Sequence, residues 1–106
     1  MRVELLYFDD CPHYERLLPR LRALVNDRAP NTEIELRWID SQDAAERERF
    51  LGSPTVRLDG EDVDPSASER SDFGIKCRLY RRADGYSETP PEEWIVAAIN
   101  RAASRA

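Results

Sequence analysis

Two cysteines and a single histidine are the side chains of this chain best suited to nucleophilic chemistry. Cys11 follows the apolar run Val3–Phe8 and precedes a helical pattern, so we expect its sulfur at the start of a helix. The unpaired N–H groups and the positive dipole end of a first helical turn favour an anion, and they stabilise the thiolate form of a cysteine placed there. The sequence therefore predicts that Cys11 is a nucleophilic thiolate. The alternative is a small packed residue at the end of a strand.

The immediate neighbours of Cys11 act on its charge in opposite directions. The two carboxylates at residues 9–10 disfavour a further anion, so the thiolate is stabilised only moderately unless their side chains point away. His13 lies in the first helical turn, where its protonated form would stabilise the Cys11 thiolate. The alternative for His13 is an exposed polar residue at a helix start. The residues alone leave both alternatives open.

The composition indicates one domain spanning residues 1–106. The chain is 41% hydrophobic and 35% charged with a net charge of -5, which argues against a general affinity for nucleic acid or for a membrane surface. No run is long and apolar enough to span a bilayer, and the N-terminus lacks a secretory signal pattern, so we expect a cytoplasmic protein. In a reducing compartment, two widely spaced cysteines are more often catalytic, redox-sensing or metal-binding than structural.

Hydrophobic periodicity and turn residues predict the elements that must position these side chains. In the first half of the chain we expect a helix over Pro12–Asp27, a strand over Ile34–Trp38 with one covered face, and a short helix that is capped by Asp40 or Ser41, ends near Phe50–Leu51 and is followed by a left-handed Gly52. An antiparallel hairpin of Pro54–Leu58 and Glu61–Val63, which turns at Asp59–Gly60, should come next. The rest of the chain should form a polar loop over Asp64–Lys76, a short strand over Cys77–Arg81, a turn at Ala83–Gly85 and a C-terminal helix with an apolar face from Trp94 to Ala102. This order, β-α-β-α-β-β-(insert)-α, predicts an α/β domain.

The same order, with a cysteine at the first strand-to-helix junction and a proline opening the third strand, resembles the thioredoxin-like fold from end to end. Residues Cys11–Tyr14 occupy the place of that family's Cys-x-x-Cys motif, with Tyr14 instead of the second cysteine. Their Pro-His pair is similar to that of strongly oxidising bacterial disulfide oxidoreductases. Pro19 lies where thioredoxins carry a helix-kinking proline. The resemblance implies a central mixed sheet of four to five strands flanked by helices.

Three segments, 5–12, 52–56 and 75–80, are together similar to a group of small bacterial thioredoxin-like proteins. Some members of that group carry selenocysteine at the position of Cys11, and some are labelled alkylmercury lyase. The shared chemistry that these segments carry is that of a reactive thiol. The resemblance therefore implies redox or thiol-transfer activity centred on Cys11.

Ser53-Pro54-Thr55 matches the loop in which the thioredoxin-like fold keeps a cis-proline beside the active-site sulfur. The resemblance implies a cis Ser53–Pro54 bond, with Pro54 as a shape-forming residue and Ser53 and Thr55 as substrate-binding residues. Such a bond leaves a neighbouring backbone group free to pair with an extended thiol substrate. Tyr14 then either donates a hydrogen bond to the sulfur or substrate, or packs against this loop.

On this template Cys77 decides the mechanism. With no second thiol at Tyr14, a mixed disulfide on Cys11 must pass to another sulfur, and the polar insert before Cys77 is long enough to bring that residue over the site. Cys77 is then a resolving cysteine. The alternative is that Cys77, alternating with Ile75 and Leu79, faces the core. The four cations between residues 76 and 82 are interpreted as a solvated strand face or as a contact for glutathione or another anion.

Three functions follow from these residues. The first is a thiol–disulfide oxidoreductase in which Cys11 attacks a disulfide, or an oxidised sulfur or selenium substrate, and Cys77 or glutathione resolves the product. Its partners are thiols or disulfides, and it needs no resident cofactor. The second is a binding protein for a soft metal ion or an organomercurial, with thiolates as ligands. The third is a redox-inactive scaffold that binds partners.

Overall fold

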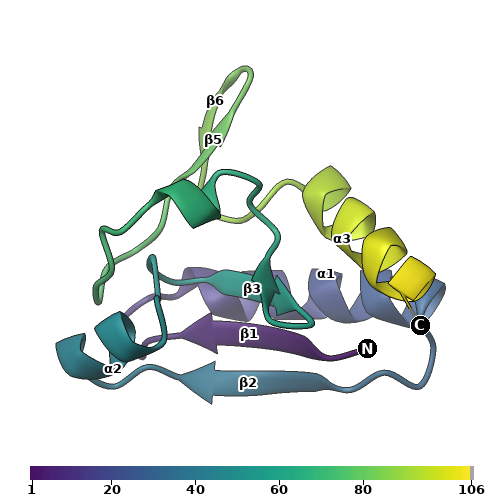
Figure 1. Ribbon diagram of the computed structural model, residues 1–106, viewed down its shortest axis with the longest axis horizontal. Coiled ribbons are helices and arrows are strands. Elements are labelled where there is room, and N and C mark those ends of the chain that lie inside the picture. The colour runs from purple at the N-terminus through teal and green to yellow at the C-terminus, as the bar shows by residue number, and fades with distance from the viewer. Residues whose placement is uncertain (106) are drawn as a thin grey trace.

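The computed structural model describes residues 1–105, which form a chain of alternating strands and helices (Figure 1). In chain order the elements are β1 (Val3–Tyr7), α1 (His13–Arg28), β2 (Ile34–Trp38), α2 (Gln42–Arg47), β3 (Thr55–Leu58), β4 (Glu61–Asp62), a 3₁₀ turn (Ala67–Glu69), β5 (Tyr80–Arg82), β6 (Gly85–Ser87) and α3 (Glu92–Arg105). The predicted α/β class is confirmed, and the predicted helices and the first hairpin are present.

A mixed four-stranded sheet with the order β2-β1-β3-β4 forms the centre of the molecule. Strands β1 and β2 run parallel, in a register that pairs Val3 with Ile34 and Tyr7 with Trp38. Strand β3 is antiparallel to β1, and β4 is antiparallel to β3. The β3–β4 connection is the predicted two-residue turn, in which Asp59 and Gly60 both have a positive φ, as a type I′ turn requires.

The strand predicted over Cys77–Arg81 is wrong in its bounds. Strand β5 begins at Tyr80 and pairs with β6 in a separate antiparallel hairpin, which projects from the body of the molecule (Figure 1). The expected turn at Ala83–Gly85 joins these two strands. Cys77 instead makes an isolated parallel bridge with Ser53. Residues 75–79 lie outside the named strands.

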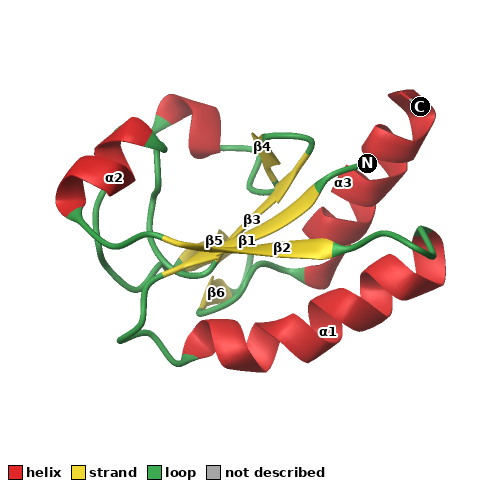
Figure 2. Cartoon of the chain, turned by 90° about the horizontal axis from the view of Figure 1, so that it is seen from below, coloured by secondary structure: helices red, strands yellow, loops and turns green. Residues whose placement is uncertain are grey.

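Helices α1 and α3 lie on one side of the sheet, and α2 lies on the other (Figure 2). Alternation along β1 separates two apolar clusters, because successive side chains of a strand point to opposite faces. Val3 and Leu5 pack with α1 and α3, whereas Leu6 packs with the short helix α2 and Phe50. The carboxyl end of β1 is therefore held on both faces, and it leads directly to Cys11.

Strand β2 departs from the sequence prediction of one covered face. Leu36 and Trp38 are 45% and 57% exposed. They share a face with Leu5 and Tyr7 of the neighbouring strand. Strand β2 is the edge of the sheet, and the apolar cluster of α1 and α3 is built on β1 and β3 and includes only Ile34 of β2 at its margin. The apolar alternation of β2 is real, but Leu36 and Trp38 stay exposed.

Gly52 has a positive φ, as predicted, and a second reason for being glycine that the sequence did not show. Helix α2 ends at Arg47, and the left-handed residue that follows it is Arg49, with φ 56°. Gly52 has φ +124°, and a Cβ there would lie 2.9 Å from the carbonyl oxygen of Lys76 and 3.0 Å from Cβ of Arg78. The glycine is favoured both by its positive φ and by the segment of backbone that passes directly over it.

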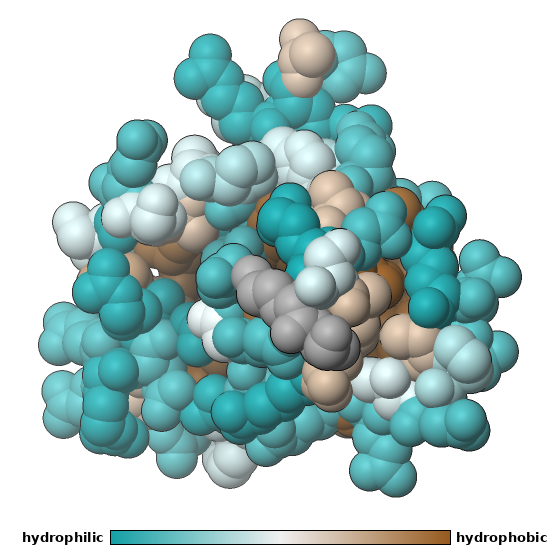
Figure 3. Space-filling view, turned by 45° about the vertical axis from the view of Figure 1, so that its right-hand side comes forward, coloured by the Kyte–Doolittle hydropathy of each residue, from teal (hydrophilic) through white to brown (hydrophobic). Residues whose placement is uncertain are grey.

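The face of the molecule seen in Figure 3 is largely hydrophilic, with apolar side chains confined to scattered recesses. This agrees with the high charged fraction of the chain. Within residues 1–105, no helix combines the length and the apolar character needed to cross a membrane.

Candidate functional site

Cys11, His13 and Cys77 meet at one point in the structure. One potential ligand atom from each of the three lies within 4.8 Å of the others. The Cys11 Sγ is 3.7 Å from Nδ1 of His13, and its thiol donates to the carbonyl oxygen of Ser53 at 3.5 Å. Both cysteines are free thiols. The prediction that Cys77 comes close to Cys11 is confirmed, whereas the alternative of a core-facing Cys77 is wrong because this residue is exposed.

The start of α1 places Cys11 and His13 together, as the sequence predicts. A turn after β1 brings the Cys11 N–H to the carbonyl of Phe8 at 3.3 Å, and Pro12 caps the helix that begins at His13. Cys11 thus immediately precedes the first turn of the helix, whose unpaired N–H groups favour an anion. The side chain of Cys11 is nevertheless 0% exposed. A reagent reaches this sulfur only if the residues covering it move.

Glu88 completes the site and was missed in the sequence. Its Oε2 lies 3.0 Å from Nε2 of His13 and 2.9 Å from Nη2 of Arg16. A carboxylate on Nε2 holds the imidazole with Nδ1 turned to the Cys11 sulfur, the order of groups found in thiol–imidazole–carboxylate sites. The only local signal is the pair of cations at residues 13 and 16 on one helix face. Nothing in the sequence indicates which carboxylate they meet.

The backbone of Ser53 is already paired, contrary to the prediction that this edge stays free for a substrate. The Ser53 N–H donates to the carbonyl of Lys76, and the Ser53 carbonyl accepts from the N–H of Arg78, both at 2.8 Å. Residues 76–78 thus lie along this edge as an extended substrate would. The chain's own segment presents Cys77 to Cys11.

The peptide bond between Ser53 and Pro54 is cis, which confirms the prediction. The Pro54 carbonyl accepts a hydrogen bond from the Tyr80 hydroxyl. Thr55 does not match its predicted role in substrate binding: it is fully buried, its hydroxyl donates to the Gly52 carbonyl at 2.6 Å, and it accepts from Arg78 at 2.9 Å. Both hydrogen-bonding functions of this hydroxyl serve the fold.

Tyr14 lies in the junction between β1 and α1. Its ring stacks on Tyr7, with centroids 4.2 Å apart and an interplanar angle of 23°. Partial burial, with the nearby negative charges of Glu15 and Asp9, raises its pKa. The stacking on Tyr7 was not predicted from the sequence. The carboxylates at residues 9–10 are exposed in the turn before Cys11.

Arg78 is the largest correction to the sequence analysis, which placed it on a solvated face. Its side chain is completely buried and its guanidinium binds two carboxylates, with 2.7 Å to Asp62 and 3.3 Å to Asp64. It also stacks on the ring of Tyr80, with Cζ 4.4 Å from the centroid. Burial of a charge is tolerated only when the charge is paired in this way. Arg78 therefore fixes the segment that carries Cys77.

The position of Cys77 raises the pKa of its thiol. The partial loss of water around the sulfur is the main cause, and the hydrogen bond and charge of the Cys11 sulfur and the charge of Glu88 act in the same direction. Cys77 is thus exposed but protonated to a higher pH than an ordinary thiol. The two cysteines thus differ in exposure and in setting. Cys11 is covered and lies at a helix start, whereas Cys77 is open to solvent and has a raised pKa.

We expect Cys11→Ser to shift the alkylation of Cys77 to lower pH. The substitution removes the neighbouring sulfur that helps to raise the pKa of Cys77, so more of Cys77 is thiolate at a given pH and its reaction with iodoacetamide is faster. The measurement is the rate against pH, followed by mass spectrometry of the Cys77 peptide, with wild-type protein as the reference. An unchanged profile would show that the two sulfurs do not interact.

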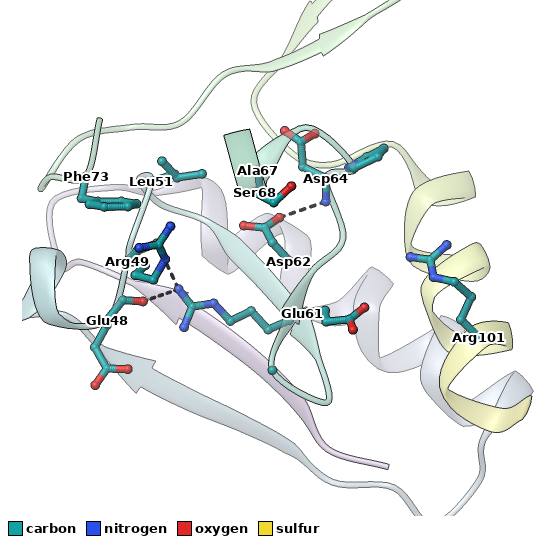
Figure 4. Close-up of a pocket in the computed structure, with 13 residues that line it drawn as sticks. Glu48, Arg49, Leu51, Glu61, Asp62, Asp64, Ala67, Ser68, Phe73 and Arg101 are labelled. Atoms are coloured by element: carbon teal, nitrogen blue, oxygen red, sulfur yellow. Dashed lines mark hydrogen bonds between the residues drawn. The ribbon is translucent and has the colours of Figure 1, made fainter. Parts of the chain in front are cut away.

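A cleft with a volume of about 510 Å³ lies away from the thiols. Figure 4 shows it among α2, the β3–β4 hairpin, the following loop and Arg101 of α3. Arg57 on its floor donates to the carbonyl oxygens of Glu48 and Arg49. Neither cysteine lines this cleft. The groups suited to chemistry are thus at the Cys11–Cys77 site.

Comparison with protein-family models, with curated proteins and with solved structures finds no match to this chain.

Proposed function

We propose that this protein is a thioredoxin-like thiol–disulfide oxidoreductase whose working pair is Cys11 and Cys77. The observation that carries the proposal is the convergence of both sulfurs and an imidazole within 4.8 Å, from positions far apart in the chain. The sheet order β2-β1-β3-β4 and the cis bond before Pro54, next to the Cys11 sulfur, support the thioredoxin-like part.

The exposures of the two sulfurs favour a different order of attack from the one expected from the sequence. Cys77 is open to solvent, whereas Cys11 lies beneath it. An external sulfur therefore reaches Cys77 first, and the mixed disulfide forms on Cys77. Cys11 acts within the protein, as the thiolate that attacks Cys77 or leaves from it.

Reduction of the oxidised protein then proceeds in two exchanges. An external thiolate attacks the Cys77 sulfur, the Cys11–Cys77 bond breaks, and its electron pair leaves on Cys11 as a thiolate. A second external thiolate attacks the external sulfur of the mixed disulfide, and Cys77 leaves and takes up a proton. In sum, one protein disulfide and two external thiols are converted into one protein dithiol and one external disulfide. The same steps in reverse reduce an external disulfide.

The residues around the pair fit these roles. Because its pKa is raised, Cys77 is the poorer leaving group, so the thiolate should leave on Cys11, whose sulfur faces Nδ1 of His13. Glu88 on Nε2 of His13 orients the imidazole so that Nδ1 faces the departing sulfur. The substrates of this proposal are small thiols and disulfides such as glutathione, because the partner of Ser53 is already the chain's own segment.

The test is a trapping experiment with two matched variants. Reduced Cys11→Ser and Cys77→Ser proteins are mixed with oxidised glutathione, and the adduct is followed by mass against time. We expect Cys11→Ser to accumulate the adduct on Cys77 at least about tenfold faster than Cys77→Ser accumulates it on Cys11, because the latter sulfur is buried. Wild-type protein should lose two mass units and retain no glutathione, since its second sulfur displaces the adduct.

Two results would contradict the proposal. If wild-type protein retains glutathione and forms no internal disulfide, the two cysteines are not a working pair. Faster adduct formation in Cys77→Ser than in Cys11→Ser would reverse the order of attack and restore Cys11 as the residue that meets the substrate. Both variants are first compared with wild type by circular dichroism, which establishes that they fold.

A further inference from the structure

We propose that the reduced protein also binds a Zn²⁺ ion between Cys11, Cys77 and His13, with one coordination position left open to solvent. Two thiolates and an imidazole are ligands that zinc prefers. In the described part of the chain, these three side chains form the one cluster of histidine, cysteine or carboxylate groups close enough to hold an ion. The site goes beyond disulfide exchange, because it uses the reduced thiols without oxidising them.

The spacing of the donor atoms fits zinc. Bonds of about 2.3 Å to sulfur and 2.0–2.1 Å to nitrogen, at tetrahedral or trigonal angles, place a bound sulfur and nitrogen about 3.6–3.8 Å apart. The Cys11 Sγ and His13 Nδ1 are 3.7 Å apart. Two zinc-bound sulfurs lie about 3.8–4.0 Å apart, so the 4.8 Å limit on this cluster leaves a shift of about 1 Å or less to be closed.

The surroundings of His13 are those of a metal ligand. A ligating histidine commonly donates its other ring N–H to a carboxylate, which fixes the tautomer and makes the free nitrogen a better donor. Glu88 occupies this position at 3.0 Å from Nε2, and Arg16 holds Glu88 in place from the same helix. The lone pair of Nδ1 then points to the sulfurs.

The two thiols are held by different parts of the fold, and this explains the open position. Cys11 lies buried at the start of α1, and Cys77 is fixed by the bridge of its neighbours to Ser53. Cys77 faces solvent, so an ion between the sulfurs keeps one side accessible to water. Binding displaces the two thiol protons, and the charges of the two thiolates neutralise the ion.

The experiment uses the full chain, kept reduced with a phosphine that does not supply thiols. Zn²⁺ is titrated against a chromophoric chelator, and Co²⁺ replaces it for absorption spectroscopy. We expect one ion per chain and, with Co²⁺, charge-transfer bands from thiolate together with the visible bands of a tetrahedral site. Cys77→Ser and His13→Gln should each weaken Zn²⁺ binding by more than about 100-fold.

Glu88→Gln supplies the sharper comparison. It leaves all three ligands in place but weakens the acceptor on Nε2, so we expect affinity to fall about 10- to 100-fold. The matched control is Glu92→Gln. Like Glu88, Glu92 is an exposed carboxylate that pairs with an arginine of α1, in this case Arg20. This control should change Zn²⁺ affinity by less than about twofold.

Three results would overturn the zinc site: no binding at one ion per chain, binding that survives Cys77→Ser, or equal effects of Glu88→Gln and Glu92→Gln. These outcomes are independent of disulfide exchange, which is measured without metal. A protein that forms the Cys11–Cys77 disulfide but binds no Zn²⁺ would refute only this inference. Zinc binding without disulfide formation would support it while refuting the redox function.

Discussion

Arg78→Ala should lower the free energy of unfolding by about 3–5 kcal/mol, the usual cost of removing one partner from a buried ion pair. The substitution leaves Asp62 and Asp64 close together without their shared cation, and it removes the stacking on Tyr80. It also removes the donor that binds the Thr55 hydroxyl at 2.9 Å. The measurement is denaturant unfolding followed by circular dichroism at neutral pH.

Arg81→Ala is the matched control, because Arg81 is an exposed arginine three residues further along, in β5. Exposed charges contribute about 0–1 kcal/mol at most, so this variant should unfold close to wild type. A loss of less than about 1 kcal/mol in Arg78→Ala would mean that the buried guanidinium is not the main support of this region. Arg78→Lys should recover only part of the loss, since one ammonium cannot reproduce the planar fork that binds two carboxylates.

Gly52→Ala should destabilise the protein and slow the closing of the Cys11–Cys77 disulfide. A non-glycine residue at φ +124° costs about 1–3 kcal/mol in backbone strain. The new Cβ would also meet backbone and Cβ atoms of residues 76 and 78 at 2.9–3.0 Å, and overpacking of this kind costs about 1–3 kcal/mol more. The contact pushes away the segment that carries Cys77.

Gly85→Ala separates the cost of backbone strain from the cost of the close Cβ contacts. Gly85 has a similar φ of +132°, but a Cβ there would meet no atom within 4 Å. This variant should lose only the strain energy, and it should oxidise at the wild-type rate because it lies in the β5–β6 hairpin. Equal unfolding energies and equal oxidation rates for the two alanine variants would rule out close packing over Gly52 as the reason for the glycine.

Local patterns in the sequence predicted the parts of the site that depend on neighbouring residues. The apolar run before Cys11 and the helical spacing after it placed this cysteine correctly, and Asp59–Gly60 predicted the β3–β4 turn. The cis bond before Pro54 came from the family resemblance. The first two features are determined by a few consecutive residues, so one sequence is sufficient to find them.

The segment after residue 74 could not be predicted in this way, because its burial is decided by residues far away. The pattern of residues 75–79 suggested apolar side chains inside and cations outside, and the structure has the reverse: Leu79 is 58% exposed and Arg78 is buried. The inversion is stable only because Asp62 and Asp64 lie where they can bind the guanidinium. Glu88 is a similar case, since its pairing with His13 depends on the path of the hairpin.

The bridge between Ser53 and residues 76–78 has a consequence for any external thiol that competes with Cys11 for the Cys77 sulfur. This backbone pairing keeps Cys77 beside Cys11, so the Cys11 sulfur meets Cys77 at a high effective concentration that does not depend on the bulk protein concentration. For a short tether this local concentration is in the millimolar range or above. An external thiol must therefore reach comparable levels before it displaces Cys11 from Cys77. The ratio of mixed disulfide to internal disulfide is then a measure of the surrounding thiol concentration.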